Sequence, residues 1–140
     1  MDIKIMKLNY HSVIPTYSKE GDAGVDLTAV TMEETDKYIS YDTKLSFEIP
    51  HGFVGLLFPR SSLTNYDLTL GNHVGVLDSS FRGSVTFRFK RTKGADSKIY
   101  NIGDRVGQLI IIPYPIINFV ESTELSTTER NTGGYGSSGN

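Results

Sequence analysis

The C-terminal segment of the chain has a composition that suits phosphate binding. Residues 130–140 read R-N-T-G-G-Y-G-S-S-G-N, with four glycines, two serines, one aromatic residue and an arginine. Glycine lets main-chain N–H groups approach a ligand closely, and successive N–H groups in a turn form an anion-binding concavity. A Gly/Ser-rich terminus can also be a disordered tail. The single ring of Tyr135 and the upstream Arg130 favour a phosphate-binding arm.

Two turns that follow apolar stretches carry groups for phosphate and water chemistry. Arg60, Ser61 and Ser62 come directly after a proline. The planar fork of arginine and two hydroxyl groups suit phosphate oxygens, although an exposed arginine in a turn often has no ligand. Asp78 ends an apolar run, where its carboxylate either acts as a general base on water or caps its own turn.

Two polar residues lie within apolar runs and therefore need partners. Asp26 is flanked by Val25 and Leu27, and an arginine is the natural partner for its charge. Gln108 lies in the apolar stretch 106–112, where an amide is either satisfied by neighbouring groups or contacts a ligand.

The elements that position these residues are predicted to be strands. Apolar and polar residues alternate with a period of two along most of the chain, and no helical stripe stands out. At most one helical turn is predicted after Pro59, capped by Ser61 or Ser62. Short strands separated by turn residues predict an all-β sandwich or barrel. The predicted strands are residues 3–5, 25–30, 45–49, 53–58, 74–77, 85–89, 106–112 and 116–120.

Composition narrows the class of protein further. A chain of 140 residues is one ordinary domain, and a net charge of −2 argues against a polynucleotide-binding protein. The chain contains no cysteine, which excludes disulfides and thiolate metal sites. No apolar stretch reaches the length of a membrane span, and the N-terminus is too charged for a signal peptide, so we expect a soluble intracellular protein with no membrane partner. A composition break near Glu121 predicts a β domain over 1–121, followed by a connector and arm over 122–140.

Five motifs in a fixed order carry a family resemblance. They read A-G-V-D-L-T-A, P-R-S-S-L, G-N-H-V-G-V-L-D-S-S-F-R-G, R-V-G-Q-L-I and R-N-T-G-G-Y-G-S-S-G, and span residues 23–139. With them the chain resembles the trimeric dUTP pyrophosphatases (dUTPases). The resemblance implies a jelly-roll-like β fold and a homotrimer, in which the C-terminal arm of one subunit closes a pocket shared by the other two. It also implies that water attacks the α-phosphorus of dUTP, giving dUMP and pyrophosphate, which keeps uracil out of DNA and supplies dUMP for thymidylate synthesis.

The resemblance also implies roles for individual residues. The implied catalytic residues are Asp78, which orients the attacking water, Gln108, and the site-building Asp26, expected to pair with Arg60 or with metal-bound water. The implied substrate contacts are Arg60, Ser61, Ser62, Asn72, Gly75, Leu77, Phe81, Gln108, Arg130, Gly133, Gly134, Tyr135, Gly136, Ser137 and Ser138. In this scheme the hairpin around Asn72 reads uracil through backbone groups, the Phe81 ring packs on the deoxyribose, and Tyr135 stacks over the base. The implied cofactor is Mg²⁺, held by substrate phosphates and water without a protein ligand.

Several positions depart from the family pattern without removing a chemical role. Ser62 stands where glycine is common, Ser80 replaces a frequent acid, and Gly107 replaces a usual alanine. Phe81 lacks the usual tyrosine hydroxyl but still excludes a ribose by shape, and Tyr135 in place of phenylalanine still offers a π face.

Three alternative functions fit the sequence less well. A deoxycytidine triphosphate deaminase would need an acid–base residue beside the base, and residues 71–77 contain no carboxylate. A non-catalytic nucleotide sensor on the same scaffold would have no need of Asp78. A P-loop nucleotidase is excluded because the glycine-rich arm has no lysine and opens no helix. The expected location is the cytoplasm, or the host-cell cytoplasm if the gene is viral.

Overall fold

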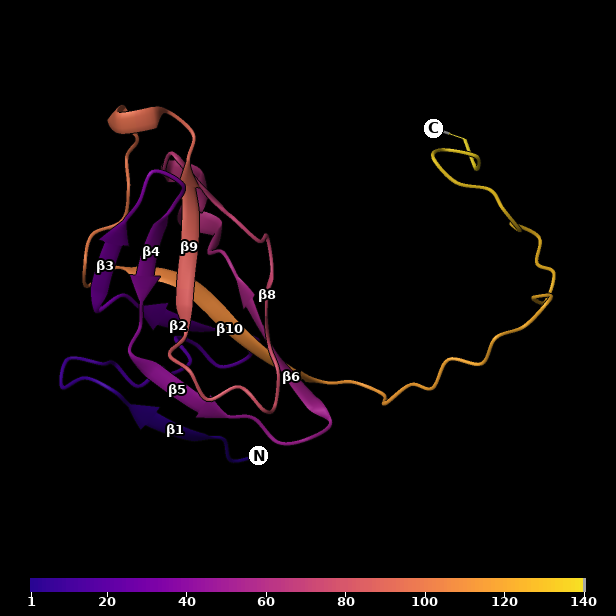
Figure 1. Cartoon of the computed structure of the whole chain (residues 1–140), viewed down its shortest axis with the longest axis horizontal. Helices are drawn as coiled ribbons and strands as arrows, with labels where there is room; N and C mark the ends of the chain where they lie inside the picture. Colours follow the sequence, from indigo (N-terminus) through magenta and orange to yellow (C-terminus); the bar gives the residue numbers. More distant parts are fainter. Residues whose placement is uncertain (140) are drawn as a thin grey trace.

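Two four-stranded antiparallel sheets enclose the core in the computed structural model, which describes residues 1–139 (Figure 1). The strand order of the first sheet is β2 (Val25–Thr28), β10 (Arg105–Pro113), β6 (Phe53–Phe58) and β8 (Gly75–Leu77). The strand order of the second is β3 (Thr31–Glu34), β4 (Ile39–Asp42), β9 (Thr86–Arg91) and β7 (Leu68–Leu70). A separate pair joins β1 (Lys4–Lys7) to β5 (Leu45–Glu48). The predicted all-β class is confirmed.

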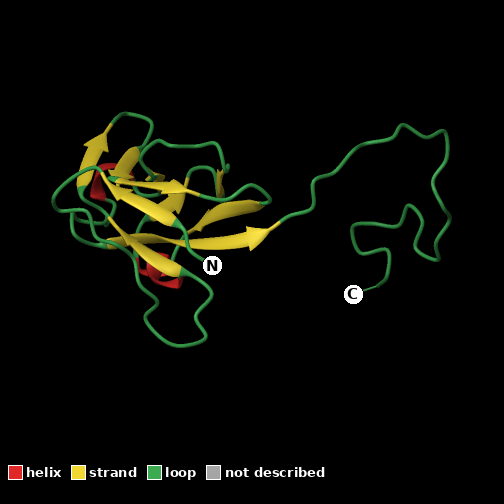
Figure 2. Cartoon of the chain, turned by 90° about the horizontal axis from the view of Figure 1, so that it is seen from below, coloured by secondary structure: helices red, strands yellow, loops and turns green. Residues whose placement is uncertain are grey.

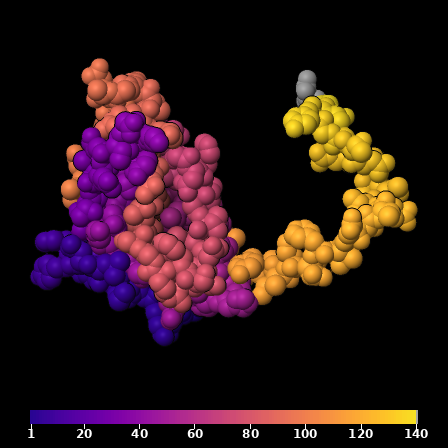
Figure 3. All heavy atoms as spheres, in the orientation of Figure 1, coloured from indigo at the N-terminus to yellow at the C-terminus, as the bar shows by residue number. Residues whose placement is uncertain are grey.

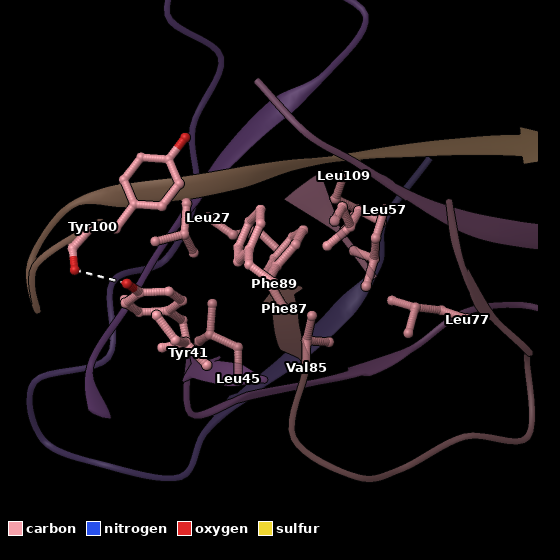
Figure 4. Packing of buried hydrophobic residues seen from close by; sticks show 14 of the residues in the cluster. Leu27, Tyr41, Leu45, Leu57, Leu77, Val85, Phe87, Phe89, Tyr100 and Leu109 are labelled. Atoms are coloured by element: carbon pink, nitrogen blue, oxygen red, sulfur yellow. Dashed lines mark hydrogen bonds between the residues drawn. The ribbon is translucent and has the colours of Figure 1, made fainter. Parts of the chain in front are cut away.

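The core is filled by the inward-facing side chains of both sheets (Figure 4). Phe87 and Phe89 alternate with charged residues along β9 and are almost completely buried. Tyr41 of β4 packs edge-on against Phe89, with 5.8 Å between ring centroids, and Leu27 and Leu109 come from the first sheet. Burying each such side chain contributes roughly 1.5–3 kcal/mol, which holds the two sheets together.

The packing of the core explains why glycine occupies position 107. A Cβ atom built on Gly107 would lie 2.1 Å from Cε1 of Phe87. The Phe87 ring is only 1% exposed and has no room to move. An alanine at position 107 would therefore force this buried ring to shift.

Most predicted strands are confirmed, with boundaries that differ by a few residues. The strands β3, β4 and β7 were not predicted: all three are only three or four residues long, and β3 also lacks a clear alternation of apolar and polar residues. The helical turn after Pro59 is present as a 3₁₀ helix over Ser61–Asn65. Its cap position is Arg60 and no side chain caps it, so the predicted serine cap is wrong. A second 3₁₀ turn spans Gly94–Asp96.

The predicted strand over residues 116–120 is wrong for the single chain. The last strand, β10, ends at Pro113, and the chain then runs away from the sheets as an extended segment (Figures 1 and 2). The apolar side chains of this segment are exposed, with Ile116 at 69% and Phe119 at 89%. A strand needs a neighbour to pair with, and the described part of the chain supplies none here.

The rest of the C-terminal segment stays apart from the body of the protein (Figure 3). Asn140, the last residue of the predicted arm, lies outside the described residues. Among residues 1–139, no helix is long and apolar enough to cross a membrane.

Candidate active site

The sheet order brings together three segments that are far apart in the sequence. Strand β10 lies between β2 and β6, so that Gln108 is opposite Asp26 on one side and Phe58 on the other. The chain leaves β6 at Phe58 and reaches Arg60 two residues later. One end of the first sheet therefore brings together Asp26, Arg60 and Gln108.

These side chains line a polar cavity of about 340 Å³. The cavity is lined by Ser18, Asp22, Ala23, Gly24, Asp26, Arg60, Ser61, Gln108 and Ile110. The sequence analysis did not assign Ser18, Asp22 or Ile110 to a site. No local sequence signal marks Ser18, since it reaches the cavity only through the path of the loop before β2.

Two arginines hold the carboxylate of Asp26. Nε of Arg60 lies 3.1 Å from Oδ1 of Asp26, and Nη1 of Arg105 lies 3.3 Å from Oδ2. The Asp26 and Arg60 side chains are 22% and 24% exposed, so this pair is partly shielded from water. Asp26 thereby satisfies its charge with two arginines, and the expected pairing with Arg60 is present in the structure.

The remaining donors of Arg60 face different partners. Nη1 donates to Oγ of Ser62 at 3.3 Å and to the carbonyl oxygen of Arg105 at 3.4 Å. Within residues 1–139, Nη2 makes no hydrogen bond to the protein, which leaves an edge of the guanidinium for an anion. Ser62 does not line the cavity, and its hydroxyl instead supports Arg60.

A buried tyrosine lies beneath this cluster. The Tyr100 side chain is 1% exposed, and among the described residues its hydroxyl has no hydrogen-bond partner. Burial raises the pKa of Tyr100, and Tyr66 raises it further, while Arg60 and Ser62 act in the opposite direction. Tyr100 was not among the predicted site residues, since nothing in the local sequence signals its proximity to Arg60.

Both ends of the Gln108 amide contact neighbouring segments of the chain. Nε2 donates to the carbonyl oxygen of Pro59 at 3.0 Å, which ties β10 to the turn that carries Arg60. A Cβ atom on Gly24 would lie 2.4 Å from Oε1 of Gln108, so the amide lies across this glycine. The mid-strand glutamine is thus held at the wall of the cavity.

The hairpin that carries Asp78 lies elsewhere on the same chain. In the antiparallel pairing of β6 with β8, Gly55 is opposite Leu77 and Leu57 is opposite Gly75. Asp78 is therefore beside the start of β6, whereas Arg60 follows its end. Five residues of extended chain separate Gly55 from Arg60, about 16 Å at ~3.3 Å per residue.

The other predicted contacts of the hairpin also lie outside the polar cavity. Gly75 and Leu77 are buried in β8, and the Phe81 side chain is 45% exposed. Asn72 lines a different cavity of about 450 Å³, together with Tyr38, Gly71, Thr86, Arg88 and Lys90. A single chain thus presents two separate halves of the predicted site.

The C-terminal arm contacts neither half in the single chain. Nε of Arg130 donates to the carbonyl oxygen of Gly133 at 2.9 Å, and the N–H of Gly133 donates back to the carbonyl of Arg130. Tyr135 is fully exposed, and Tyr135 and Gly136 both have positive φ angles. The predicted contacts Gly134, Ser137 and Ser138 belong to the same exposed coil.

The described donor groups of the cavity do not form a protein-only metal site. Among residues 1–139, no group of three or more His, Cys, Asp or Glu side chains could hold a metal ion. The cavity has two carboxylates, Asp22 and Asp26, and both oxygens of Asp26 already accept hydrogen bonds from arginine. These residues fit an ion whose ligands are phosphate oxygens and water, because Mg²⁺ commonly keeps several waters when it binds substrate phosphates.

The fold and the cavity together define an all-β protein with a polar, arginine-lined site suited to an anion. A family model described as dUTPase matches residues 10–139. The deoxyuridine 5′-triphosphate nucleotidohydrolase of Methylobacillus flagellatus is 35% identical over 147 residues, which cover 99% of this chain and 96% of the relative. The corresponding protein of Escherichia phage T5 is 37% identical over 147 residues, covering 98% of each. The chain belongs to the dUTPase family.

The fold of a solved relative agrees with this assignment. The dUTPase of Staphylococcus bacteriophage 80alpha, in a structure with dUpNHpp, aligns with a TM-score of 0.83 at 24% identity. The alignment covers 99% of this chain and 98% of that chain. The two proteins therefore share one fold over their whole length.

Proposed function

We propose that this protein is a dUTP diphosphatase, which hydrolyses dUTP to dUMP and pyrophosphate. Membership of the dUTPase family over residues 10–139 supports this activity. The observation that carries the proposal is the meeting of Asp26, Arg60 and Gln108 in one polar cavity, although they come from three distant segments. The attack of water on the α-phosphorus follows from the family resemblance.

In this proposal the polar cavity binds the phosphates. The free edge of Arg60 and the hydroxyl of Ser61 supply donors, and Asp26 fixes the orientation of the guanidinium through its 3.1 Å contact with Nε. Charge-assisted hydrogen bonds of this kind are about twice as strong as neutral ones. Groups held in place before the reaction stabilise developing charge without reorganisation.

The hairpin supplies the base and the nucleoside contacts. Asp78 is exposed at the end of β8, where its carboxylate is free to accept a proton from water. General-base catalysis of this type contributes about 10²–10⁴-fold to the rate. Asn72, Gly75 and Leu77 read uracil, and the half-exposed Phe81 ring packs on the deoxyribose.

Mg²⁺ is the proposed cofactor. When bound, it would neutralise part of the negative charge on the phosphates. Asp22 and Asp26 are the carboxylates of the cavity that would accept hydrogen bonds from its water ligands. Arg60 contributes a second, permanent positive charge to the same region.

We also propose a homotrimer whose active sites combine the halves of different subunits. Within one chain Gly55, opposite the residue before Asp78, is already about 16 Å from Arg60 along β6, too far for Asp78 to activate water at a phosphate held by Arg60. The exposed apolar residues after Pro113, among them Ile116 and Phe119, supply a surface that another copy would cover. The family resemblance supports three copies.

The proposed arm closes the site of another subunit. The exposed loop from Arg130 to Ser138 would place main-chain N–H groups and a guanidinium on the γ-phosphate, with Tyr135 over the base. In this scheme residues 1–121 are the β domain and 122–140 the connector and arm. A location in the cytoplasm follows from the proposed substrate, which belongs to the nucleotide pool.

A pyrophosphate-release assay tests the activity. Purified protein with Mg²⁺ is given dUTP, UTP, dCTP or dTTP in separate reactions. We expect release from dUTP far above the other three. Ammonia release from dCTP would favour a deaminase instead, and binding of dUTP without turnover would favour a nucleotide sensor.

A further inference from the structure

The turn between β8 and β9 is fixed by its own hydrogen bonds. The N–H of Phe81 donates to the carbonyl oxygen of Asp78 at 3.0 Å. Nη1 of Arg82 donates to the carbonyl oxygens of Ser79 at 2.6 Å and Phe81 at 3.0 Å. The hydroxyl of Ser46 in β5 donates to the carbonyl of Arg82 at 2.6 Å. The backbone that carries Phe81 is therefore anchored to the sheet.

The ring of Phe81 lies on Gly83. A Cβ atom built on Gly83 would be 2.6 Å from Cζ, 3.0 Å from Cε2 and 3.4 Å from Cε1 of Phe81. Carbon atoms in contact lie about 3.5–4.0 Å apart, so the ring occupies the space that a side chain at position 83 would need. Because Phe81 is 45% exposed, the rest of the ring remains open to a ligand.

The cost of adding a Cβ atom at Gly83 depends on whether the Phe81 ring can move away. At Gly107 a Cβ atom would clash with the Phe87 ring, which is buried in the core and cannot turn into solvent. At Gly83 it would meet the far end of a half-exposed side chain, which can turn into solvent. The backbone of Gly83 is also outside the left-handed region, so alanine there is crowded only by the ring.

We propose that Gly83 is a specificity-determining residue, which sets the height of the Phe81 ring over the deoxyribose. This inference rests on the proposed hydrolysis of dUTP. With alanine at position 83, the Phe81 ring is displaced from its position on Gly83 and no longer packs correctly on the deoxyribose. Hydrolysis of dUTP then falls more than that of UTP, because the seated ring favours the deoxyribose and already excludes the 2′-hydroxyl.

The test compares four proteins: wild type, Gly83→Ala, Phe81→Ala and the double variant. For each, kcat/KM is measured with dUTP and with UTP, and the thermal midpoint is recorded. We expect Gly83→Ala to lower the ratio of kcat/KM for dUTP to kcat/KM for UTP by about fivefold or more. This factor corresponds to the lower end of the free-energy cost of a packing mismatch. We expect its thermal midpoint to stay at the wild-type value. In the Phe81→Ala background, Gly83→Ala should change the ratio no further.

Each contrary outcome is informative. An unchanged ratio in Gly83→Ala overturns the proposal, as does an equal effect of Gly83→Ala with and without the Phe81 ring. Gly107→Ala is the matched control, since the same change against a buried ring should lower the midpoint by about 4 °C or more. A comparable fall for Gly83→Ala would show that the contact is structural. Failure of the wild-type protein to release pyrophosphate from dUTP would instead refute the proposed function.

Discussion

The hydroxyl of Tyr41 donates a 2.7 Å hydrogen bond to the carbonyl oxygen of Tyr100, 59 residues further along the chain. Tyr41 is completely buried in β4, and Figure 4 shows this bond at one end of the aromatic cluster. The contact ties the second sheet to the loop that precedes β10, the strand that carries Gln108.

This buried phenol predicts a loss of stability at alkaline pH. Burial raises the pKa of Tyr41 from 10.0 to about 12, although the hydrogen bond to Tyr100 opposes the shift. A raised pKa in the folded state means that the stabilisation is complete below pH 10 and is lost as the pH rises through about 12. Between these values we expect the free energy of unfolding to fall by about 1.4 kcal/mol per pH unit.

Denaturant unfolding at a series of pH values from 8 to about 12 measures this slope. Tyr41→Phe is the control, because phenylalanine cannot ionise. The variant should be less stable at neutral pH by about 1–3 kcal/mol, since the carbonyl of Tyr100 loses its donor. Its alkaline slope should be shallower than that of the wild type. Equal slopes would assign the alkaline transition to other groups.

Asp78→Asn should preserve substrate binding and abolish most turnover. The amide keeps the shape of the carboxylate but cannot take a proton from water, so kcat should fall by about 10²–10⁴-fold. Calorimetric titration with dUpNHpp and steady-state kinetics with dUTP separate binding from rate. A near-normal kcat would remove Asp78 from the role of general base.

Light scattering should give a particle of about three times the chain mass of 15.5 kDa. The separation of Asp78 from Arg60 within one chain requires more than one copy, and the family resemblance supplies the number three. The measurement is made at micromolar protein, with and without dUpNHpp. A monomer that hydrolyses dUTP at a normal rate would contradict the shared site.

Mixing two inactive variants gives a second test of the shared site. Asp78→Asn and Arg60→Ala chains, unfolded together and refolded, should form mixed assemblies in which some sites receive both intact residues. Activity should then exceed that of either variant refolded alone. If both residues of one site came from one chain, mixing would restore nothing.

Truncation after Glu129 should leave a folded assembly that turns over poorly. Residues 130–139 of the removed segment are exposed in the single chain, apart from the half-buried Gly133, and contribute nothing to the core, so the melting temperature should change by no more than about 2 °C. They include Arg130 and the glycine-rich loop, which are proposed to cover the phosphates, so kcat/KM should fall by at least about 10²-fold. Normal turnover would identify the segment as an inert tail, and a sharp drop in melting would make it structural.

Local patterns in the sequence were sufficient for much of this protein. The alternation along residues 85–89 placed Phe87 and Phe89 in the core, because side chains of a strand point to opposite faces in turn. The turn residues at Gly52 and Gly103 were equally readable, and both have positive φ angles. The order of the five motifs was enough to indicate the family.

Other features depended on contacts between distant segments. The sequence marked Asp26 as a charge in need of an arginine, but only strand pairing brought both Arg60 and Arg105 to it. Residues 116–120 form an apolar run typical of a strand, yet stay unpaired in one chain because a strand forms only beside a neighbour.

The placement of the two halves of the site was likewise decided by the tertiary structure. Motif order gives no distance between Asp78 and Arg60, whereas the antiparallel register of β6 and β8 puts them at opposite ends of one strand. The sequence does not show that an aromatic ring lies over both Gly83 and Gly107, nor that only the ring at Gly107 is buried. Residue type and spacing determine local conformation and chemistry. Strand register and packing are properties of the whole chain, and they determine which distant residues come into contact.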